Sequence, residues 1–228
     1  MAVSSHGWAL PAGIEHSGAM LSFKDPFELR LKQALKDLRH GLPVFVADAA
    51  DREGEVDAVM AASKATEKWI AWLVRHTSGF VCAPMPPALA DKLKLPLMVP
   101  ENQEKFRTAY TVSVDASSGV TTGISAHDRA RTLRVLGSDD AKPGDLMRPG
   151  HILPLRANPD GVLGRPGHTE AAVDLVRLSG AGQVGVIAEL LHFDGRLLTF
   201  KEAADIAHQS GLIYLSIEEL ADYLAARK

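Results

Sequence analysis

The fold class is clearest from residues 42–57, which read LPVFVADAADREGEVD. The first six of these residues form a short apolar run, which is typical of a buried β-strand. The remaining ten contain five carboxylates and one arginine, and they follow the apolar run directly. This stretch therefore predicts a strand inside the protein that leads into a charged loop.

Helices are predicted on both sides of this stretch. Before it, Asp25 offers a capping residue, Pro26 suits the first helical position, and Gly41 predicts the end of the helix. After it, residues 66–76 carry apolar side chains at helical spacing and are followed by Gly79. The strand and its charged loop are therefore expected between two helices.

Strands and helices continue to mix along the rest of the chain. Further strands are predicted at residues 80–83, 110–115, 152–155, 184–191 and 212–215. Further helices are predicted at residues 87–95, 125–136 and 169–178, from Lys201 onward, and after a cap at Ser216. Because there is no regular βαβ period and no internal repeat, we expect an α/β (α+β) fold with a mixed, twisted sheet covered by helices.

The first 22 residues differ from the rest of the chain. They are rich in Gly, Ser, Ala and His and show no periodicity. They predict a flexible N-terminal leader over residues 1–22, outside the fold, followed by a single domain over residues 23–228.

The composition excludes several classes of protein. A hydrophobic content of 46% and a charged content of 23% are ordinary for a soluble globular protein. The net charge of −3 argues against a broad basic surface for nucleic acid or an anionic membrane. Cys82 is the only cysteine, which excludes an internal disulfide and a cysteine-based zinc cluster. Since no apolar run reaches the ~20 residues of a membrane span and no secretory signal is apparent, a cytoplasmic location is expected.

The charged loop is the first candidate site. Its carboxylates are those of Asp48, Asp51, Glu53, Glu55 and Asp57. Clustered carboxylates suit a hard divalent cation such as Mg²⁺, which takes oxygen ligands from protein and substrate. A solvated acidic surface loop explains the composition equally well. Arg52 in the middle of the loop favours a phosphosugar site.

Two Gly-His pairs form a second candidate site. The pairs Gly150-His151 and Gly167-His168 each follow an Arg-Pro dipeptide. The second pair opens a predicted helix, where free backbone N–H groups favour phosphate, and Arg165 and Thr169 would complete an anion site. His168 suits a metal ligand and His151 a proton-transfer group. A purely structural role for each histidine is the simpler alternative.

Two further features carry weaker signals. Residues 119–129 form a small-residue, hydroxyl-rich loop that opens a helix, so the backbone can approach a ligand there, although Ser125 is better explained as a helix cap. Glu189 interrupts the apolar run at residues 184–191, which is costly unless the carboxylate is paired or faces a site. A charge on an edge strand explains Glu189 equally well.

Taken in order along the chain, these motifs resemble those of the 3,4-dihydroxy-2-butanone 4-phosphate synthases, a family of riboflavin biosynthesis. The matching stretches are residues 51–57, 75–82, 108–114, 119–129, 142–145, 148–151, 161–163, 167–171 and 174–175. The resemblance covers about residues 25–225. Long matches such as Gly-Val-Thr-Thr-Gly-Ile-Ser-Ala at residues 119–126 are highly specific.

The resemblance implies a three-layered fold and an activity. The family converts D-ribulose 5-phosphate to L-3,4-dihydroxy-2-butanone 4-phosphate and formate with Mg²⁺ or Mn²⁺, as a homodimer with sites near the subunit interface. Such a reaction starts with loss of a proton beside the carbonyl. A divalent ion on adjacent sugar oxygens stabilises the resulting enediolate, and acid and base groups then move protons.

The resemblance also implies roles for individual residues. Glu53 and His168 would be metal ligands. The implied catalytic residues are His151, Glu189, Asp48 and Glu55. The implied substrate-binding residues are Arg52, Glu53, Asp57, Cys82, Thr122, Asp128, Arg165, Pro166, Gly167, His168 and Thr169.

The charged loop departs from the family pattern Asp-Arg-Glu-Asn-Glu-Gly-Asp, because Gly54 and Val56 stand in place of the asparagine and the glycine. A β-branched Val56 would reshape the loop if the backbone there needed a glycine-only conformation. Ala188 replaces a usual cysteine, which we expect to be tolerated.

These departures leave two alternatives to the synthase activity. One is a specialised paralogue acting on another phosphosugar, and the other is a non-catalytic phosphosugar-binding protein. The presence of every implied ligand and catalytic residue favours an active enzyme.

Overall fold

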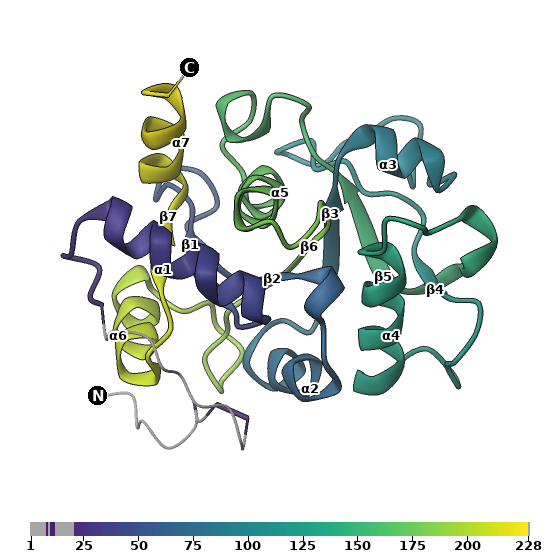
Figure 1. Cartoon of the computed structure of the whole chain (residues 1–228), viewed down its shortest axis with the longest axis horizontal. Helices are drawn as coiled ribbons and strands as arrows, with labels where there is room; N and C mark the ends of the chain where they lie inside the picture. Colours follow the sequence, from purple (N-terminus) through teal and green to yellow (C-terminus); the bar gives the residue numbers. More distant parts are fainter. Residues whose placement is uncertain (1–7, 9, 12–20, 228) are drawn as a thin grey trace.

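A computed structural model describes residues 8, 10–11 and 21–227 of the chain. Within these residues the strands form one mixed seven-stranded sheet, in the order β4-β5-β3-β6-β2-β1-β7 (Figure 1). The strands are β1 Val44–Ala47, β2 Val56–Ala61, β3 Cys82–Met85, β4 Val114–Ala116, β5 Leu146–Arg156, β6 Gly185–Glu189 and β7 Tyr214–Ser216. The predicted α/β fold with a mixed sheet is confirmed.

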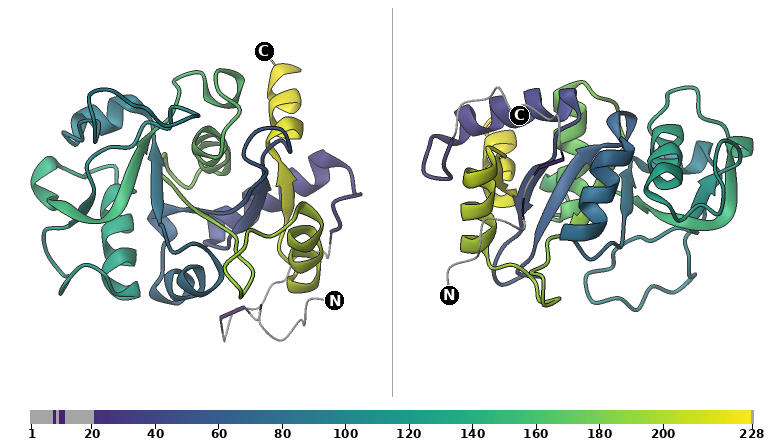
Figure 2. Two further views of the ribbon diagram at one scale, coloured as in Figure 1. Left: turned by 180° about the vertical axis from the view of Figure 1, so that it is seen from behind. Right: turned by 90° about the horizontal axis from the view of Figure 1, so that it is seen from below.

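Helices cover both faces of this sheet (Figures 1 and 2). They are α1 Phe27–His40, α2 Glu67–His76, α3 Pro87–Lys92, α4 Ala126–Leu136, α5 His168–Ser179, α6 Phe200–Ser210 and α7 Ile217–Ala225. Among the described residues, none of the helices has both the length and the apolar character needed to cross a membrane.

The alternation of side chains along β1 shows how the layers are held together. Val44 and Val46 belong to a core cluster with residues of α1, α5 and α7. Phe45, which lies between them, belongs to the opposite cluster with residues of α2, α4 and α6. Since successive side chains of a strand point to opposite faces, the sheet has a helical layer on each side, as the three-layered arrangement requires.

The strand register places polar residues at one end of the sheet. β1 and β2 pair antiparallel, with Ala47 opposite Val56, so the charged loop becomes the connection of a hairpin. β2 and β6 also pair antiparallel, with Asp57 opposite Glu189. Asp57, near the start of β2, and Glu189, at the end of β6, therefore lie side by side on neighbouring strands.

Several helix boundaries follow the predicted caps. Gly41 ends α1 with a φ of 83°, in the left-handed region that glycine adopts without strain. Ser125 and Ser216 cap α4 and α7, because each hydroxyl accepts the backbone N–H of the third residue onward. The prediction of Asp25 as a cap is wrong: Pro26 is the residue before the first helical turn, and the Asp25 carboxylate accepts the N–H of Ser22.

Two strand predictions need correction. The patterns in the sequence predict no strand at Val56–Ala61, yet this segment is β2, the neighbour of β1. All its residues are buried, so there is no polar and apolar alternation to reveal it. Conversely, only the end of the predicted strand at residues 110–115 joins the sheet as β4, while Tyr110 and Thr111 form isolated bridges. Thr111 is tied to the carbonyl of Pro154 instead.

The predicted flexible leader falls mainly on residues outside the described part of the chain. At one described position the prediction is wrong, because Trp8 is buried in the core. Its ring stacks on His76 of α2 at a centroid distance of 4.7 Å and meets Trp72 edge-on at 6.0 Å. Aromatic contacts of this kind stabilise packing beyond the area they bury. Trp8 is therefore part of the domain.

Candidate active site

A small pocket lies where the hairpin loop, the start of α5 and the ends of β2 and β6 meet. It is lined by Arg52, Glu53, Glu55, Asp57, Cys82, Thr108, Tyr110, Leu155, Arg165, His168, Thr169, Ile187 and Glu189. The sheet explains why three of these residues share the pocket. Asp57 is opposite Glu189, and Cys82 is opposite Ile187, two residues before Glu189 on the same face of β6.

Asp48 holds the hairpin loop together. One of its carboxylate oxygens accepts the backbone N–H of Glu55 at 2.9 Å. The other accepts the N–H of Glu53 at 3.0 Å and a guanidinium N–H of Arg52 at 3.1 Å. These bonds satisfy backbone donors of a loop that would otherwise be held only by its ends. These contacts give Asp48 a structural role in the loop, and the catalytic role that the resemblance implies stays a prediction.

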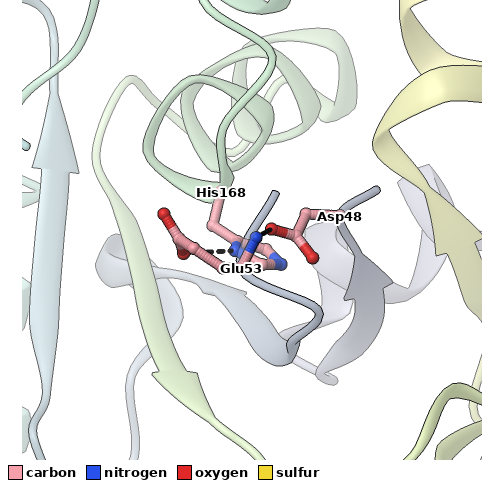
Figure 3. A group of neighbouring side chains, drawn as sticks. All are labelled: Asp48, Glu53 and His168. Carbon is pink, nitrogen blue, oxygen red and sulfur yellow. Dashed lines mark hydrogen bonds and ion pairs between the residues drawn. The ribbon is translucent and has the colours of Figure 1, made fainter. Parts of the chain in front are cut away.

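Three side chains offer ligand atoms to a metal ion. Atoms of Asp48, Glu53 and His168 all lie within 4.8 Å of one another (Figure 3). Nε2 of His168 lies 3.0 Å from the carbonyl oxygen of Val46, which can only accept a hydrogen bond, so Nε2 carries a proton. In the neutral ring Nδ1 is then the free nitrogen, and it lies 3.9 Å from a carboxylate oxygen of Glu53. A histidine oriented by a backbone carbonyl is a usual metal ligand.

The carboxylates around His168 are crowded and poorly compensated. Asp57 is buried, and its Oδ1 atom has no hydrogen-bond partner among the described residues. Burial raises the pKa of Asp57 to about 8, with Glu189 and Glu55 adding to the effect and His168 opposing it. Burial and the charge of Glu189 raise the pKa of Glu55 to about 7. An unpaired buried oxygen within a carboxylate cluster fits a bound divalent cation.

His168 and Glu53 have the opposite electrostatic behaviour. Burial alone would lower the pKa of His168, but the carboxylates of Asp57, Glu53 and Asp48 raise it to about 9. Burial alone would raise the pKa of Glu53, but His168 and Arg52 bring it below its ordinary value. The pair is therefore charged when no metal is bound, and a cation that uses Nδ1 must displace a proton.

Two guanidinium groups, each paired with carboxylates, line the other side of the pocket. Nη1 of Arg165 pairs with the buried Glu170 at 2.7 Å, and its Nη2 donates to the Thr108 hydroxyl at 3.0 Å. A Cβ added to Gly167 would lie 2.5 Å from Arg165 and 3.0 Å from a guanidinium nitrogen of Arg52. The two guanidinium groups therefore meet at Gly167, the N-cap of α5. Guanidinium groups beside a helix N-terminus suit a phosphate group.

The remaining predicted residues of this region have clear positions. Glu189 accepts a hydrogen bond from the hydroxyl of Ser78, which also donates its backbone N–H to the Glu189 carbonyl at 2.8 Å. Burial raises the pKa of the Cys82 thiol well above its ordinary value, so Cys82 lines the pocket as a neutral group. Thr169 lines the pocket in the first turn of α5, while Pro166 and Gly167 link Arg165 to His168.

His151, Thr122 and Asp128 are also predicted site residues, but they do not line this pocket. His151 is in β5, where its ring contacts the Asp115 carboxylate at 2.7 Å. Asp128 accepts the N–H groups of Thr121 and Gly123 and so shapes the loop that contains the exposed Thr122. We call the pocket lined by the residues given above the cation pocket. We call His151 and Asp115, together with Thr122 and Asp128 of the neighbouring loop, the His151 group.

Several polar residues that line the pocket or contact these groups are not singled out by the sequence patterns, among them Ser78, Thr108, Tyr110 and Asp115. Ser78, Thr108 and Tyr110 lie in stretches that match the family motifs. Those motifs could therefore have pointed to them as site residues. Asp115 is the last residue of a predicted strand, and site residues are often found where a strand meets a loop. Its partner His151 is distant in sequence, which hid the pair.

The two departures in the charged loop do not disturb the pocket. Gly54 has a φ of 73°, in the left-handed region that asparagine also tolerates. Val56 lies in β2 opposite Ala47, where an extended and buried position suits a β-branched side chain. Val56 would reshape the loop only if its backbone conformation were one that glycine alone adopts. Val56 has a strand conformation, so no reshaping is expected.

Comparisons with known proteins agree with this description. The family model for 3,4-dihydroxy-2-butanone 4-phosphate synthase matches residues 32–223. A synthase of that name from Bordetella pertussis is 46% identical over 205 residues, covering 90% of this chain and 89% of its own. Another from Chromobacterium violaceum is 47% identical and covers 88% of this chain and 95% of its own.

Solved structures give the same result. A 3,4-dihydroxy-2-butanone 4-phosphate synthase in complex with two magnesium ions has a TM-score of 0.81 and 41% identity, covering 85% of this chain and 95% of its own. The synthase of Candida albicans has a TM-score of 0.79 and 42% identity, with 85% and 96% coverage. Together with the family model, these similarities show that the chain belongs to the 3,4-dihydroxy-2-butanone 4-phosphate synthase family.

Proposed function

We propose that this chain converts D-ribulose 5-phosphate to L-3,4-dihydroxy-2-butanone 4-phosphate and formate, as a lyase of riboflavin biosynthesis. The observation that carries the proposal is the composition of the cation pocket. A carboxylate and imidazole cluster for a metal lies beside two guanidinium groups at a helix N-terminus. A ketose phosphate needs both, because its carbonyl end requires a Lewis acid and its other end carries the phosphate.

We assign the metal to Glu53 and His168, with the unpaired oxygen of Asp57 facing them. Mg²⁺ and Mn²⁺ both accept this set of oxygen and nitrogen ligands, and we propose Mg²⁺ or Mn²⁺ as the physiological ion. A bound divalent ion supplies Lewis-acid stabilisation to sugar oxygens on which negative charge develops. The magnesium-bound relative supports a divalent metal in this fold.

The side chains of the chain perform the remaining tasks. Arg52, Arg165 and the first turn of α5, including Thr169, bind the phosphate and so hold the sugar in one orientation. Glu55, whose pKa burial and the charge of Glu189 raise to about 7 in the metal-free protein, is proposed as a proton-transfer group. Glu189, held by Ser78, and His151 serve as further proton-transfer groups.

We propose a homodimer with sites near the subunit interface. His151 does not line the cation pocket of its own chain, which is consistent with a second copy that supplies this residue. Large apolar side chains beside the His151 group are exposed, including Ile124 at 53% and Met147 at 54%. We also propose a cytoplasmic location, in line with the single free thiol of Cys82.

Formate release tests the proposed function. Purified protein, ribulose 5-phosphate and Mg²⁺ are expected to yield formate at a rate that depends on enzyme concentration. Glu53→Gln is expected to abolish release, and Glu101→Gln, which removes an exposed carboxylate elsewhere, is expected to preserve it. Calorimetric binding of the substrate to folded, metal-loaded protein without any formate would contradict the proposal and identify a phosphosugar-binding protein.

A further inference from the structure

The His151 group contains a buried carboxylate whose two oxygens have different partners. Oδ1 of Asp115 accepts the backbone N–H of His151 at 2.9 Å. Oδ2 lies 2.7 Å from Nδ1 of the His151 ring. The Asp115 side chain is 9% exposed, whereas the His151 side chain is 40% exposed. Nδ1 of the imidazole is thus held by the protein, while the side chain as a whole stays partly exposed.

This contact determines where the ring carries its proton. An ionised carboxylate only accepts hydrogen bonds, so a short contact with Oδ2 requires a proton on Nδ1. In the neutral ring, Nε2 then has the free lone pair. We propose that Asp115 is a positioning residue that fixes His151 as the Nδ1–H tautomer and presents Nε2 as a proton acceptor. The assignment of the tautomer follows from the contact geometry alone. The role of His151 as a proton acceptor in catalysis rests on the proposed function.

A loop packs against this pair and leaves it little freedom. Gly123 has a φ of 92°, and a Cβ at this position would overlap Oδ2 of Asp115 and lie 2.7 Å from Nδ1 of His151. The loop is held in place by Asp128, whose Oδ2 accepts the backbone N–H of Gly123 at 3.0 Å and the hydroxyl of Thr121 at 2.7 Å. The close approach of the Gly123 backbone therefore restrains both the carboxylate and the ring.

The variant Asp115→Asn separates the proposed role from a merely structural one. The backbone N–H of His151 is an obligatory donor, so the oxygen of the introduced amide must face it. The NH₂ group of that amide then faces Nδ1 and donates to it, which requires Nδ1 to accept. Asp115→Asn should accordingly keep the packing but move the ring proton from Nδ1 to Nε2, where it blocks the lone pair.

Nitrogen-detected NMR of histidine-labelled protein measures this directly, with His151→Ala used to assign the signal. We expect the wild type at a pH where the ring is neutral to show a protonated Nδ1 and a bare Nε2, and Asp115→Asn to show the reverse. In the same variant kcat is expected to fall by about 100-fold or more, the usual size of a proton-transfer contribution, with KM unchanged. Asp140→Asn, which removes an exposed carboxylate, is the matched control and should change neither readout.

A wild-type ring with the proton on Nε2 would overturn the proposal, and this measurement does not require the variant to fold. If the folded Asp115→Asn protein has the reversed tautomer and an unchanged kcat, then Nε2 of His151 is not a proton acceptor in the reaction, and the catalytic role proposed for the tautomer is overturned. A wild type that has the proposed tautomer yet releases no formate would contradict the proposed function while supporting the assignment of the proton.

Discussion

Gly167 lies where the two guanidinium groups of the cation pocket meet. A methyl group there would meet guanidinium nitrogens of Arg165 and Arg52. We expect Gly167→Ala to displace these groups and to raise KM for ribulose 5-phosphate about 10-fold or more, because charge-assisted hydrogen bonds to phosphate are lost. Steady-state kinetics check this, with Gly144→Ala as the control, since a Cβ at Gly144 meets no atom within 4 Å. Equal KM values for both variants would show that the guanidinium groups do not bind the phosphate.

His76 should make the stability of the domain depend on pH. Its ring is half-buried between Trp8 and Trp72, and burial together with the charge of Arg75 lowers its pKa below the ordinary value of about 6.5. Below pH ~6.5 the unfolded chain binds a proton at this position that the folded chain binds only at lower pH, so the free energy of unfolding falls as the pH falls through this range.

The variant His76→Phe isolates this contribution. We expect the midpoint of thermal unfolding to fall more between pH 7.5 and 5.5 in the wild type than in His76→Phe, which retains an aromatic ring and does not titrate. Differential scanning calorimetry measures both. Parallel pH dependences would mean that His76 titrates normally in the folded protein.

Single residues also show how far sequence could predict the site. Nine predicted residues line the cation pocket: Arg52, Glu53, Glu55, Asp57, Cys82, Arg165, His168, Thr169 and Glu189. Local patterns at strand ends and a helix start indicated eight of them, whereas Cys82 was indicated only by the resemblance to the family. The hydrogen bonds from the Asp48 carboxylate to the backbone of the loop could not be predicted, because they depend on how the loop folds. The Asp115 and His151 contact spans 36 positions and depends on strand pairing, so it was out of reach.

At the level of elements, β4 and β5 approach unusually closely beside His151. Their register shifts between Val114 and Asp115, and a Cβ at Gly150 would overlap the backbone of these two residues. Because backbone cannot move aside as a flexible side chain does, we expect Gly150→Ala to destabilise the protein by about 1–3 kcal/mol or more. Chemical denaturation measures the loss, and Gly144→Ala is again the control. A free energy of unfolding equal to that of the wild type would contradict the close packing of these strands.

Elements were predictable where their sequences carry a local signal. α4, α6 and α7 start next to hydroxyl caps and end where the apolar spacing stops. β2 was missed because it is buried throughout, and Tyr110 and Thr111 were assigned to a strand because alternation reports exposure and not pairing. The order of the strands in the sheet depends on long-range contacts and could not be predicted. The sequence predicted only that the sheet is mixed.

For the whole molecule, a bound cation should act as a stabilising ligand. A divalent ion at 100 times its Kd adds about 2.7 kcal/mol to the free energy of unfolding if it binds only the folded state. We expect MgCl₂ to raise the midpoint of thermal unfolding of metal-free protein and chelator to reverse the change. Glu53→Gln should lose this response and Glu101→Gln should keep it. A full response in Glu53→Gln would place the cation elsewhere.

The proposed homodimer is a second property of the whole molecule. Light scattering after size exclusion is expected to give twice the 24.5 kDa of one chain. Ile124→Lys, at an exposed apolar position beside the His151 group, should shift the mass towards that of one chain and lower formate release together. A single-chain mass for a wild type that releases formate would show that one chain holds a complete site.

The hairpin between β1 and β2 has a consequence for how this sequence can vary. Asp48 fixes the loop at one length, and the following register places Asp57 on the face of the sheet that α5 covers. Because the side chains of a strand alternate, removing or adding one residue between positions 49 and 54 would turn Asp57 to the opposite face. A library of variants in this loop should therefore tolerate many exchanges of exposed residues and almost no change in the number of residues that the loop contains.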